Sequence, residues 1–235
     1  MDGDIATLTG RLERLSASVV SDVLDHCGYP EQSLSSAIHP LDRGMRLAGP
    51  ALCFAGVSVG EPSPATAGPQ LSSFEIDRGV SPGSIVVIAT NGHQVSAVVG
   101  GLMGLEFRRK GCGGVVVDGG VRDSAELIDL GLPTFCRYVT PLISARRWRL
   151  TVVNKAISLP GQASDSVTVE PSDLIVGDAD GVLVVPRGIA AQVIAWSEEL
   201  ASIEEKIVGR LKAGEAREAV FAALPRFAHI RPLRG

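Results

Sequence analysis

The sequence predicts an α/β fold, a layered sandwich of strands and helices, and three observations support this class. Apolar strands at residues 85–89 and 114–117 stand next to helical segments at 101–109 and 124–129, and such alternation is typical of α/β layers. Hydrophobic residues make up 45% of the 235 residues and charged residues 20%, which is the composition of a globular chain able to bury a core. The 27 glycines indicate many tight turns between these elements.

The first third of the chain combines helices with one long strand. Residues 5–27 carry hydrophobic side chains three and four positions apart, which is the spacing of amphipathic helices. Residues 47–58 are a strand with a Gly-Pro interruption. The loop at 59–73 is rich in Pro, Ser and Gly, and its length predicts a lid or a subunit contact.

The last third begins with strands and ends with a helix. Short strands follow one another without helices between them, which favours an antiparallel or mixed sheet that could close into a barrel-like unit. Their expected ranges are 134–136, 152–159, 167–169, 173–176 and 182–185. The stripe of apolar residues over 189–213 predicts a helix that Gly214 ends.

This C-terminal helix, about 25 residues long, exceeds what a compact domain usually needs. We therefore expect it to cross to a neighbouring subunit. Residues 1–235 are interpreted as a single domain with a core over about 15–215 and a tail at 215–235.

Charge and cysteine content exclude several classes of protein. The net charge is −4, and phosphate binding needs concentrated positive charge, so we expect no nucleic-acid partner. The short basic run Arg146-Arg147-Trp148-Arg149 is interpreted as a solvated face or subunit contact. No apolar run approaches the roughly 18 residues of a membrane span, and the four cysteines contain no CxxC pair. We expect a cytoplasmic protein with reduced thiols and no membrane partner.

The most informative segment is 98–123, where a glycine-rich helix start precedes a buried strand and a tight turn. That turn presents Arg122 and Asp123 side by side. Amide groups at a helix start attract anions, guanidinium grips a carboxylate, and a carboxylate holds a hard divalent ion. This set suits a small chelating anion such as a 2-oxo acid. The alternatives are a surface ion pair at the start of a helix and glycines that only permit close packing.

Four segments of this chain resemble the class II 4-hydroxy-4-methyl-2-oxoglutarate aldolases, which share a fold with the regulator of ribonuclease activity A. The combined group is called RraA-like. The matching segments, in order over roughly residues 15–215, are Gly100–Met103, Gly113–Asp123, Pro171–Pro186 and Glu204–Gly214. The resemblance implies a sandwich similar to phosphohistidine swivelling domains. It also implies a homotrimer or a homohexamer with active sites between subunits.

The resemblance further implies roles for individual residues. Arg122 and Asp123 would be catalytic, and Asp123 would hold Mg²⁺ or Mn²⁺. The pyruvoyl group would be bound by Arg122 and by the backbone of Gly100, Gly101, Leu102 and Met103. Glu204 from a neighbouring subunit's C-terminal helix would approach the metal, with Glu205 and Glu199 as weaker matches.

One position departs from the aldolases, which carry an acidic residue twenty-one positions before the arginine, where this chain has Gly101. Either another acid replaces it, for example from residues 59–78, or the reaction is oxaloacetate decarboxylation, which needs less proton transfer. Both reactions would release pyruvate from a small 2-oxo acid. A non-catalytic RraA-like binding protein and an isomerase of a sugar-derived acid are the alternatives.

Overall fold

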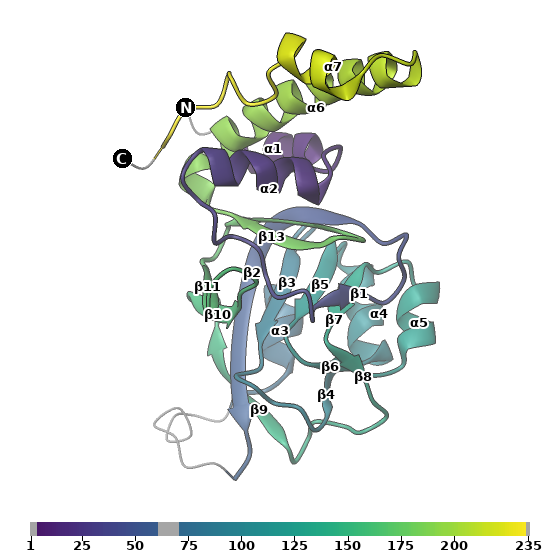
Figure 1. Ribbon diagram of the computed structural model, residues 1–235. Coiled ribbons are helices and arrows are strands. Elements are labelled where there is room, and N and C mark those ends of the chain that lie inside the picture. The colour runs from purple at the N-terminus through teal and green to yellow at the C-terminus, as the bar shows by residue number, and fades with distance from the viewer. Residues whose placement is uncertain (1–3, 61–70, 234–235) are drawn as a thin grey trace.

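The computed structural model describes residues 4–60 and 71–233, in which a mixed sheet carries one layer of helices above it and another group of helices at its side (Figure 1). The α/β class predicted from the sequence is confirmed. Part of the expected 59–73 loop lies outside the described residues, so its role as a lid or subunit contact stays a prediction.

The main sheet is mixed, as the run of strands predicted. Its order is β1-β7-β5-β3-β2-β12-β13, with β9 paired to the outer part of β2. Strands β2, β3, β5 and β7 are parallel neighbours, whereas β12 pairs antiparallel with both β2 and β13. The strands are β1 (His39–Pro40), β2 (Leu47–Ser58), β3 (Ile85–Ala89), β5 (Gly114–Val117), β7 (Thr134–Cys136), β9 (Trp148–Val153), β12 (Leu174–Asp178) and β13 (Gly181–Val185).

The central strands are buried on both faces, as parallel strands between covering layers should be. In β3, Ile85 and Val87 belong to one apolar cluster, whereas Val86 and Ile88 belong to another. The second cluster includes side chains from the flanking helices α3 (Phe74–Gly79), α4 (Gly101–Arg109) and α5 (Ser124–Asp129). The opposite face is closed partly by the hairpin of β10 (Ile157–Pro160) and β11 (Ser166–Val169).

A separate helical layer covers the β12–β13 end of the sheet (Figure 1). It contains α1 (Ile5–Leu12), α2 (Ala17–His26), α6 (Ala190–Lys212) and α7 (Arg217–Ala223), with the 3₁₀ turn η2 (Arg187–Ile189) before α6. The apolar stripes of α1, α2 and α6 share one buried cluster with β12 and β13. Gly214, with φ of 88°, follows the end of α6 as predicted.

Two details differ from the sequence prediction. The single strand expected at 152–159 is wrong, because Asn154 adopts a left-handed φ of 47° and the chain turns there between β9 and β10. The sequence pattern did not predict this turn, because apolar β-branched residues, which favour strands, lie on both sides of it. The expected tail contains α7, whose Arg217 guanidinium lies 4.9 Å from the centre of the Phe221 ring.

The cysteine side chains and the hydrophobicity of the helices bear on two of the sequence predictions. All four cysteines are free and buried, and burial raises the pKa of the Cys53 thiol to about 12, so it stays protonated. No helix within the described ranges is both long and apolar enough to cross a bilayer.

Candidate functional site

The predicted site is built where two parallel strands run into two helices. A three-stranded sheet contains β4 (Ala97–Val99), β6 (Gly120–Val121) and β8 (Tyr138–Val139). Strand β4 leads into α4, and its neighbour β6 leads into α5. Parallel strands end at one edge of a sheet, where ligands of α/β proteins commonly bind. The helix start at Gly100 and the turn at Arg122 therefore meet.

Arg122 and Asp123 lie together, as the sequence predicted. The Arg122 amide donates to the Val99 carbonyl at 3.0 Å, which ties the turn to β4. The Arg122 Nε lies 3.5 Å from the Asp123 Oδ2, and each side chain keeps 34% of its exposure. Asp123 has a left-handed φ of 56° immediately before α5. This uncommon conformation turns its carboxylate back toward α4.

The Asp123 carboxylate contacts the start of α4. Its Oδ2 accepts a hydrogen bond of 2.9 Å from the Gly101 amide. One of the amides left free at a helix start is thereby satisfied by a carboxylate from the neighbouring helix. The interpretation of Arg122 and Asp123 as only a cap for α5 does not fit this contact, because Asp123 binds the amide of α4 instead.

Gly100 and Gly101 allow the side chains of Arg122, Asp123 and Glu126 to approach the start of α4 closely. A Cβ atom at Gly100 would lie 2.9 Å from both the Arg122 Nε and the Asp123 Oδ2. A Cβ atom at Gly101 would lie 2.0 Å from the Glu126 Oε2. Gly104, one turn on, lets α4 pack against Leu127 of α5. The glycines therefore serve packing and site geometry together.

Glu126 is the site residue that the sequence analysis missed. Its carboxylate occupies the space where a side chain at position 101 would begin, so an acid stands beside Gly101 although residue 101 itself has none. This acid comes from α5, and an acid supplied by residues 59–78 stays a prediction because residues 61–70 lie outside the described part of the chain. The available signal was its spacing, because residues three apart on a helix share a face, and Glu126 follows Asp123 by three.

A cavity of about 600 Å³ opens beside this cluster, a volume typical of small-molecule sites. Gly100, Leu102, Met103 and Arg122 line it, as predicted for a bound pyruvoyl group. Among the described residues, Gly101 and Asp123 do not belong to its lining. They lie behind Gly100 and Arg122, in contact with them.

The acidic residues fit a hard divalent ion that keeps water ligands. Within residues 4–60 and 71–233, no three His, Cys, Asp or Glu side chains converge to hold a metal ion. Mg²⁺ usually binds one or two carboxylates together with water and substrate oxygens. The partly exposed Asp123 carboxylate offers such a position, and the Glu126 carboxylate stands next to the same glycine. Asp123 as a metal ligand stays a prediction.

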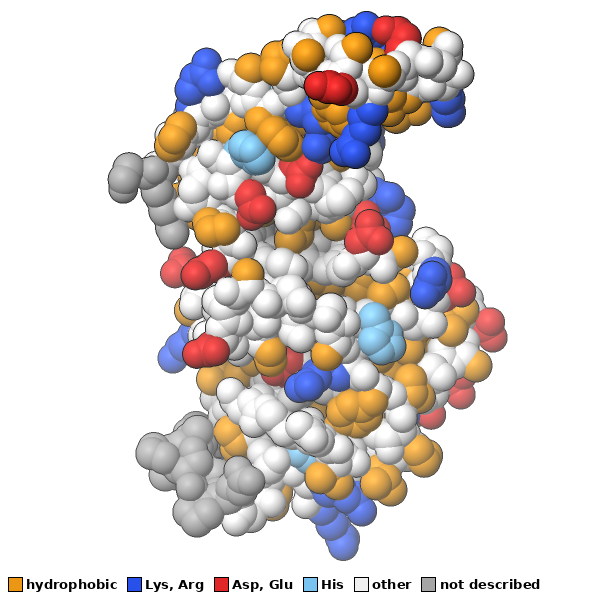
Figure 2. All heavy atoms as spheres, viewed as in Figure 1, with side chains coloured by type: hydrophobic (Ala, Val, Ile, Leu, Met, Phe, Trp, Pro, Cys, Tyr) orange, Lys and Arg blue, Asp and Glu red, His pale blue; other side chains and the backbone are white. Residues whose placement is uncertain are grey.

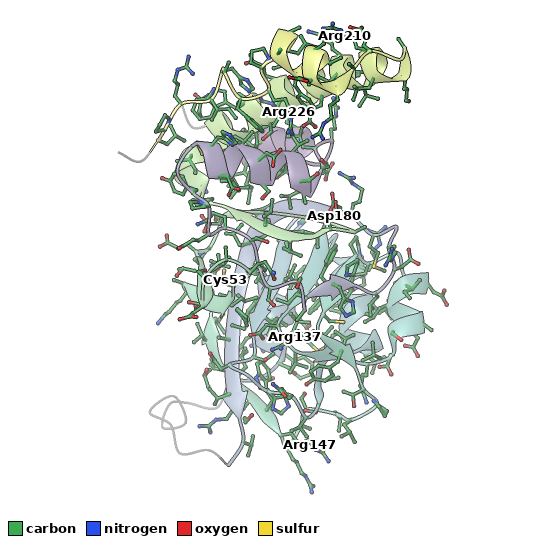
Figure 3. The ribbon with its side chains drawn as sticks, in the orientation of Figure 1. Cys53, Arg137, Arg147, Asp180, Arg210 and Arg226 are labelled. Atoms are coloured by element: carbon green, nitrogen blue, oxygen red, sulfur yellow. The ribbon has the colours of Figure 1, made fainter. Side chains whose placement is uncertain are left out.

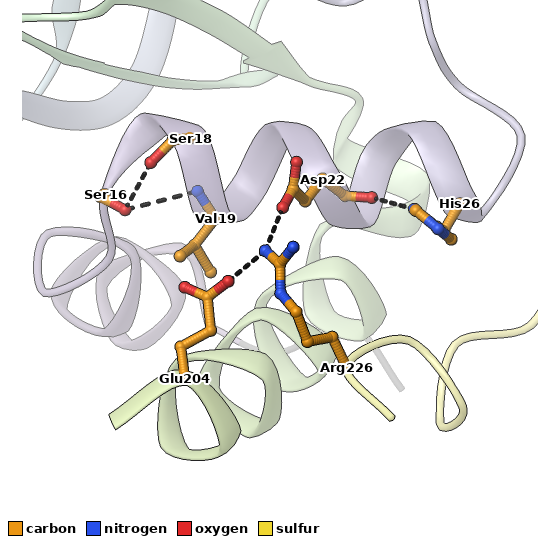
Figure 4. A network of polar contacts seen from close by, with 7 residues as sticks. All are labelled: Ser16, Ser18, Val19, Asp22, His26, Glu204 and Arg226. Carbon is orange, nitrogen blue, oxygen red and sulfur yellow. Dashed lines mark hydrogen bonds and ion pairs between the residues drawn. The ribbon is translucent and has the colours of Figure 1, made fainter. Parts of the chain in front are cut away.

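Glu204 lies in the helical layer rather than at this site. Figure 4 shows the Arg226 guanidinium between the carboxylates of Asp22 and Glu204, with the Asp22 contact at 2.7 Å. Glu199, one of the weaker candidates, lies 3.9 Å from the His229 ring. The role of Glu204, Glu205 or Glu199 at a neighbouring subunit's metal remains a prediction.

Two buried polar residues support the strands around the site. The His93 ring bonds the hydroxyls of Ser58 and Ser96, each at 2.8 Å, and burial lowers its pKa. Asp118 accepts a hydrogen bond from the Thr90 amide, and burial raises its pKa. Both are almost fully buried. Their contacts indicate structural roles.

Comparisons with known proteins show which family this chain resembles. A family model named RraA-like, described as Aldolase/RraA, matches residues 17–184. A protein of Halalkalibacterium halodurans named "Putative 4-hydroxy-4-methyl-2-oxoglutarate aldolase" is 30% identical over 191 residues, which cover 81% of this chain and 82% of that protein.

Solved structures show the same fold. The crystal structure of Streptomyces coelicolor RraAS2, described as an unusual member of the RNase ES inhibitor RraA protein family, has a TM-score of 0.75 at 26% identity. The similarity covers 87% of this chain and 98% of that one. An uncharacterized protein from Pseudomonas syringae pv. tomato has a TM-score of 0.78 at 25% identity, with 92% and 96% covered.

Proposed function

Because this chain belongs to the RraA-like family, we propose that it is a divalent-metal-dependent lyase that cleaves a carbon–carbon bond of a small 2-oxo acid and releases pyruvate. The reaction is a retro-aldol cleavage of the 4-hydroxy-4-methyl-2-oxoglutarate type or a decarboxylation of oxaloacetate. One observation carries the proposal. The Arg122 guanidinium and the start of α4 line one cavity, with the Asp123 carboxylate 3.5 Å from the Arg122 Nε.

Substrate binding follows from the donors at this place. Amides at the start of α4 carry the positive end of the helix dipole, and they suit the carboxylate and 2-oxo oxygens. The Arg122 guanidinium adds charge-assisted hydrogen bonds to the same oxygens. When bound, Mg²⁺ or Mn²⁺ supplies Lewis-acid polarisation of the 2-oxo group, and Asp123 is the residue that would hold it.

Bond cleavage requires a place for the electron pair and a group to move a proton. As the bond between carbon 3 and carbon 4 breaks, its electron pair stays on the carbon 3 side and forms the pyruvate enolate. The fixed positive charge of Arg122 stabilises the enolate oxygen. In the retro-aldol reaction the carbon 4 hydroxyl loses a proton, and carbon 3 later gains one. The Glu126 carboxylate occupies the space beside Gly101, so we place this proton transfer on Glu126, directly or through water. Decarboxylation needs only the final protonation.

The proposed enzyme is one domain over residues 1–235, assembled as a homotrimer or homohexamer. In that assembly α6 crosses to a neighbouring subunit and brings Glu204 near its metal. A small 2-oxo acid is the expected partner. On the face drawn in Figure 2, basic and acidic side chains are interspersed without a continuous basic surface. The absence of a nucleic-acid partner stays a prediction from the net charge of −4.

The test is pyruvate release from 4-hydroxy-4-methyl-2-oxoglutarate and from oxaloacetate by the purified protein. We expect turnover of at least one substrate with Mg²⁺ or Mn²⁺, loss of turnover after chelation, and recovery when the ion is returned. Arg122→Met should abolish the enzymatic release that remains above the metal-only background. If the wild-type protein releases no pyruvate above that background, the proposed reaction is wrong. The assignment to the RraA-like family would not be affected.

The second candidate is a non-catalytic regulatory protein, favoured by the structural similarity to RraAS2. Co-purification with a ribonuclease by a protein that has no metal-dependent turnover would support this alternative. Arg122→Met would then leave ribonuclease binding unaffected, because the cavity would have no role in it.

A further inference from the structure

The cavity beside Arg122 carries positive charge from a second part of the chain. It is lined by Arg122 after β6, by Arg146 in the loop before β9, and by Arg149 in β9 itself. None of the described residues that line it is Asp or Glu. Three arginines without an acidic neighbour in the lining indicate a ligand with more than one negative charge.

The loop that carries Arg146 is fixed to the site by backbone hydrogen bonds. The Ala97 amide of β4 donates to the Leu142 carbonyl at 2.9 Å. The amides of Arg147 and Trp148 both donate to the Ser144 carbonyl, at 2.7 and 2.9 Å. Arg146 therefore reaches the cavity from a defined turn, and its exposed side chain can meet an entering anion.

Arg149 holds a donor that lacks a partner. Arg149 is paired with Val57 in the β2–β9 ladder. The Arg149 Nη2 is buried and has no hydrogen bond to any residue in the described part of the chain. Buried donors in native proteins are nearly always paired, so an orphaned one calls for an explanation such as a ligand. Because this nitrogen is buried and Arg149 lines the cavity with other atoms, the side chain must turn toward the cavity before a ligand carboxylate can accept its hydrogen bond.

We propose that Arg146 and Arg149 form a second anion-binding wall, which selects 2-oxo acids that carry a further carboxylate. This inference rests on the proposed function, because it takes the 2-oxo acid head group to be held at Gly100 and Arg122. The volume of about 600 Å³ leaves room for a substrate that extends beyond that head group. Arg146 and Arg149 are thus specificity-determining residues that bind the far end of the substrate.

The experiment compares two ligands that share the 2-oxo acid head group and differ at the far end. 2-Oxoglutarate ends in a carboxylate, whereas 2-oxopentanoate ends in a methyl group at the same position. Both are titrated calorimetrically into the full chain at a fixed Mg²⁺ concentration. The measured quantity is the ratio of the two dissociation constants, so a general loss of affinity cancels.

The variants are Arg146→Gln, Arg149→Gln and the double variant, with Arg147→Gln as the matched control. Arg147 is adjacent in sequence and extends away from the body of the protein (Figure 3), with its Nη1 donating to the Ile143 carbonyl at 3.0 Å. Thermal unfolding verifies that each variant is folded. Arg149→Lys and Arg146→Lys test whether charge alone restores the preference.

We expect the wild-type protein to prefer 2-oxoglutarate by about 10- to 100-fold, the value of one charge-assisted hydrogen bond or more. The double variant should reduce this preference to near unity, while Arg147→Gln keeps it. A wild-type protein without the preference, or a folded double variant that retains it, overturns the proposal. A wild-type protein that prefers 2-oxoglutarate but releases no pyruvate would contradict the proposed reaction and would still support the second anion-binding wall.

Discussion

The position of Glu126 beside Gly101 leads to a prediction that separates catalysis from stability. In Gly101→Ala, the new Cβ would lie 2.0 Å from the Glu126 Oε2, whereas ordinary contact begins at 3.4 Å. The carboxylate must therefore move by about 1.4 Å, the difference between these distances. Misplacement by about 1 Å is able to cost roughly 100-fold in rate, so we expect pyruvate release to fall by about that factor.

The same substitution should leave folding almost unchanged. The clashing atom is the end of a flexible, exposed side chain that can rotate away. Gly101 lies in the first turn of α4 and does not have a positive φ. Alanine stabilises helices by up to about 1 kcal/mol relative to glycine. We expect an unfolding free energy within about 1 kcal/mol of the wild-type value.

The assay couples pyruvate release to NADH oxidation by lactate dehydrogenase and is paired with urea denaturation. Gly10→Ala is the control, because its Cβ on α1 meets nothing within 4 Å, so activity should not change. Glu126→Gln should reproduce the loss, and Gly101→Ala should add little to it, since both act through one carboxylate. Full activity in Gly101→Ala would refute a need for Glu126 in this position.

Three further predictions concern single residues. Arg122→Lys should lower kcat by about 100-fold or more, because lysine cannot reproduce the paired donors of guanidinium; steady-state kinetics measure this. Gly104→Ala should lower the unfolding free energy by about 1 to 3 kcal/mol, since its Cβ would lie 2.3 Å from the Leu127 Cδ2; urea denaturation would show no loss if the helices can separate freely. Burial lowers the pKa of His93 from 6.5, so the unfolded chain binds its proton first as pH falls below 6.5, and stability declines toward acid pH. His93→Gln should flatten that decline in denaturation curves, and an unchanged slope would contradict it.

The strand and helix order could be predicted because each element has a clear local pattern. The alternation around residues 85–129 fixed the parallel strands and the helices α4 and α5 almost to the residue. The break at Asn154 could not be predicted in this way. Asn154, Lys155 and Ala156 are only a short interruption between residues that favour strands, and long-range pairing of β9 with β2 decides where that strand ends.

The site could be predicted only where its residues are adjacent in sequence. Arg122 and Asp123 could be predicted as a pair because they are adjacent. The glycines predict a close approach at the start of α4 but do not identify the side chains that approach. Glu126 and Arg149 reach the site through the meeting of α4 with α5 and the pairing of β9. Such contacts depend on tertiary structure, so no local pattern identifies them.

The contact between Glu204 and Arg226 bears on the proposed role of Glu204 at a neighbouring subunit's metal. This contact could not be predicted from a local pattern, because α7 and the turn after it bring Arg226 back onto α6 and α2 (Figure 4). The two side chains keep 26% and 30% of their exposure, and partly exposed ion pairs contribute only about 0 to 1 kcal/mol. Exchanging Arg226 for a divalent cation as the partner of Glu204 would therefore cost the chain little stability. The intramolecular ion pair and the intersubunit role are compatible, and Arg226 is the residue that would compete with the metal for this carboxylate.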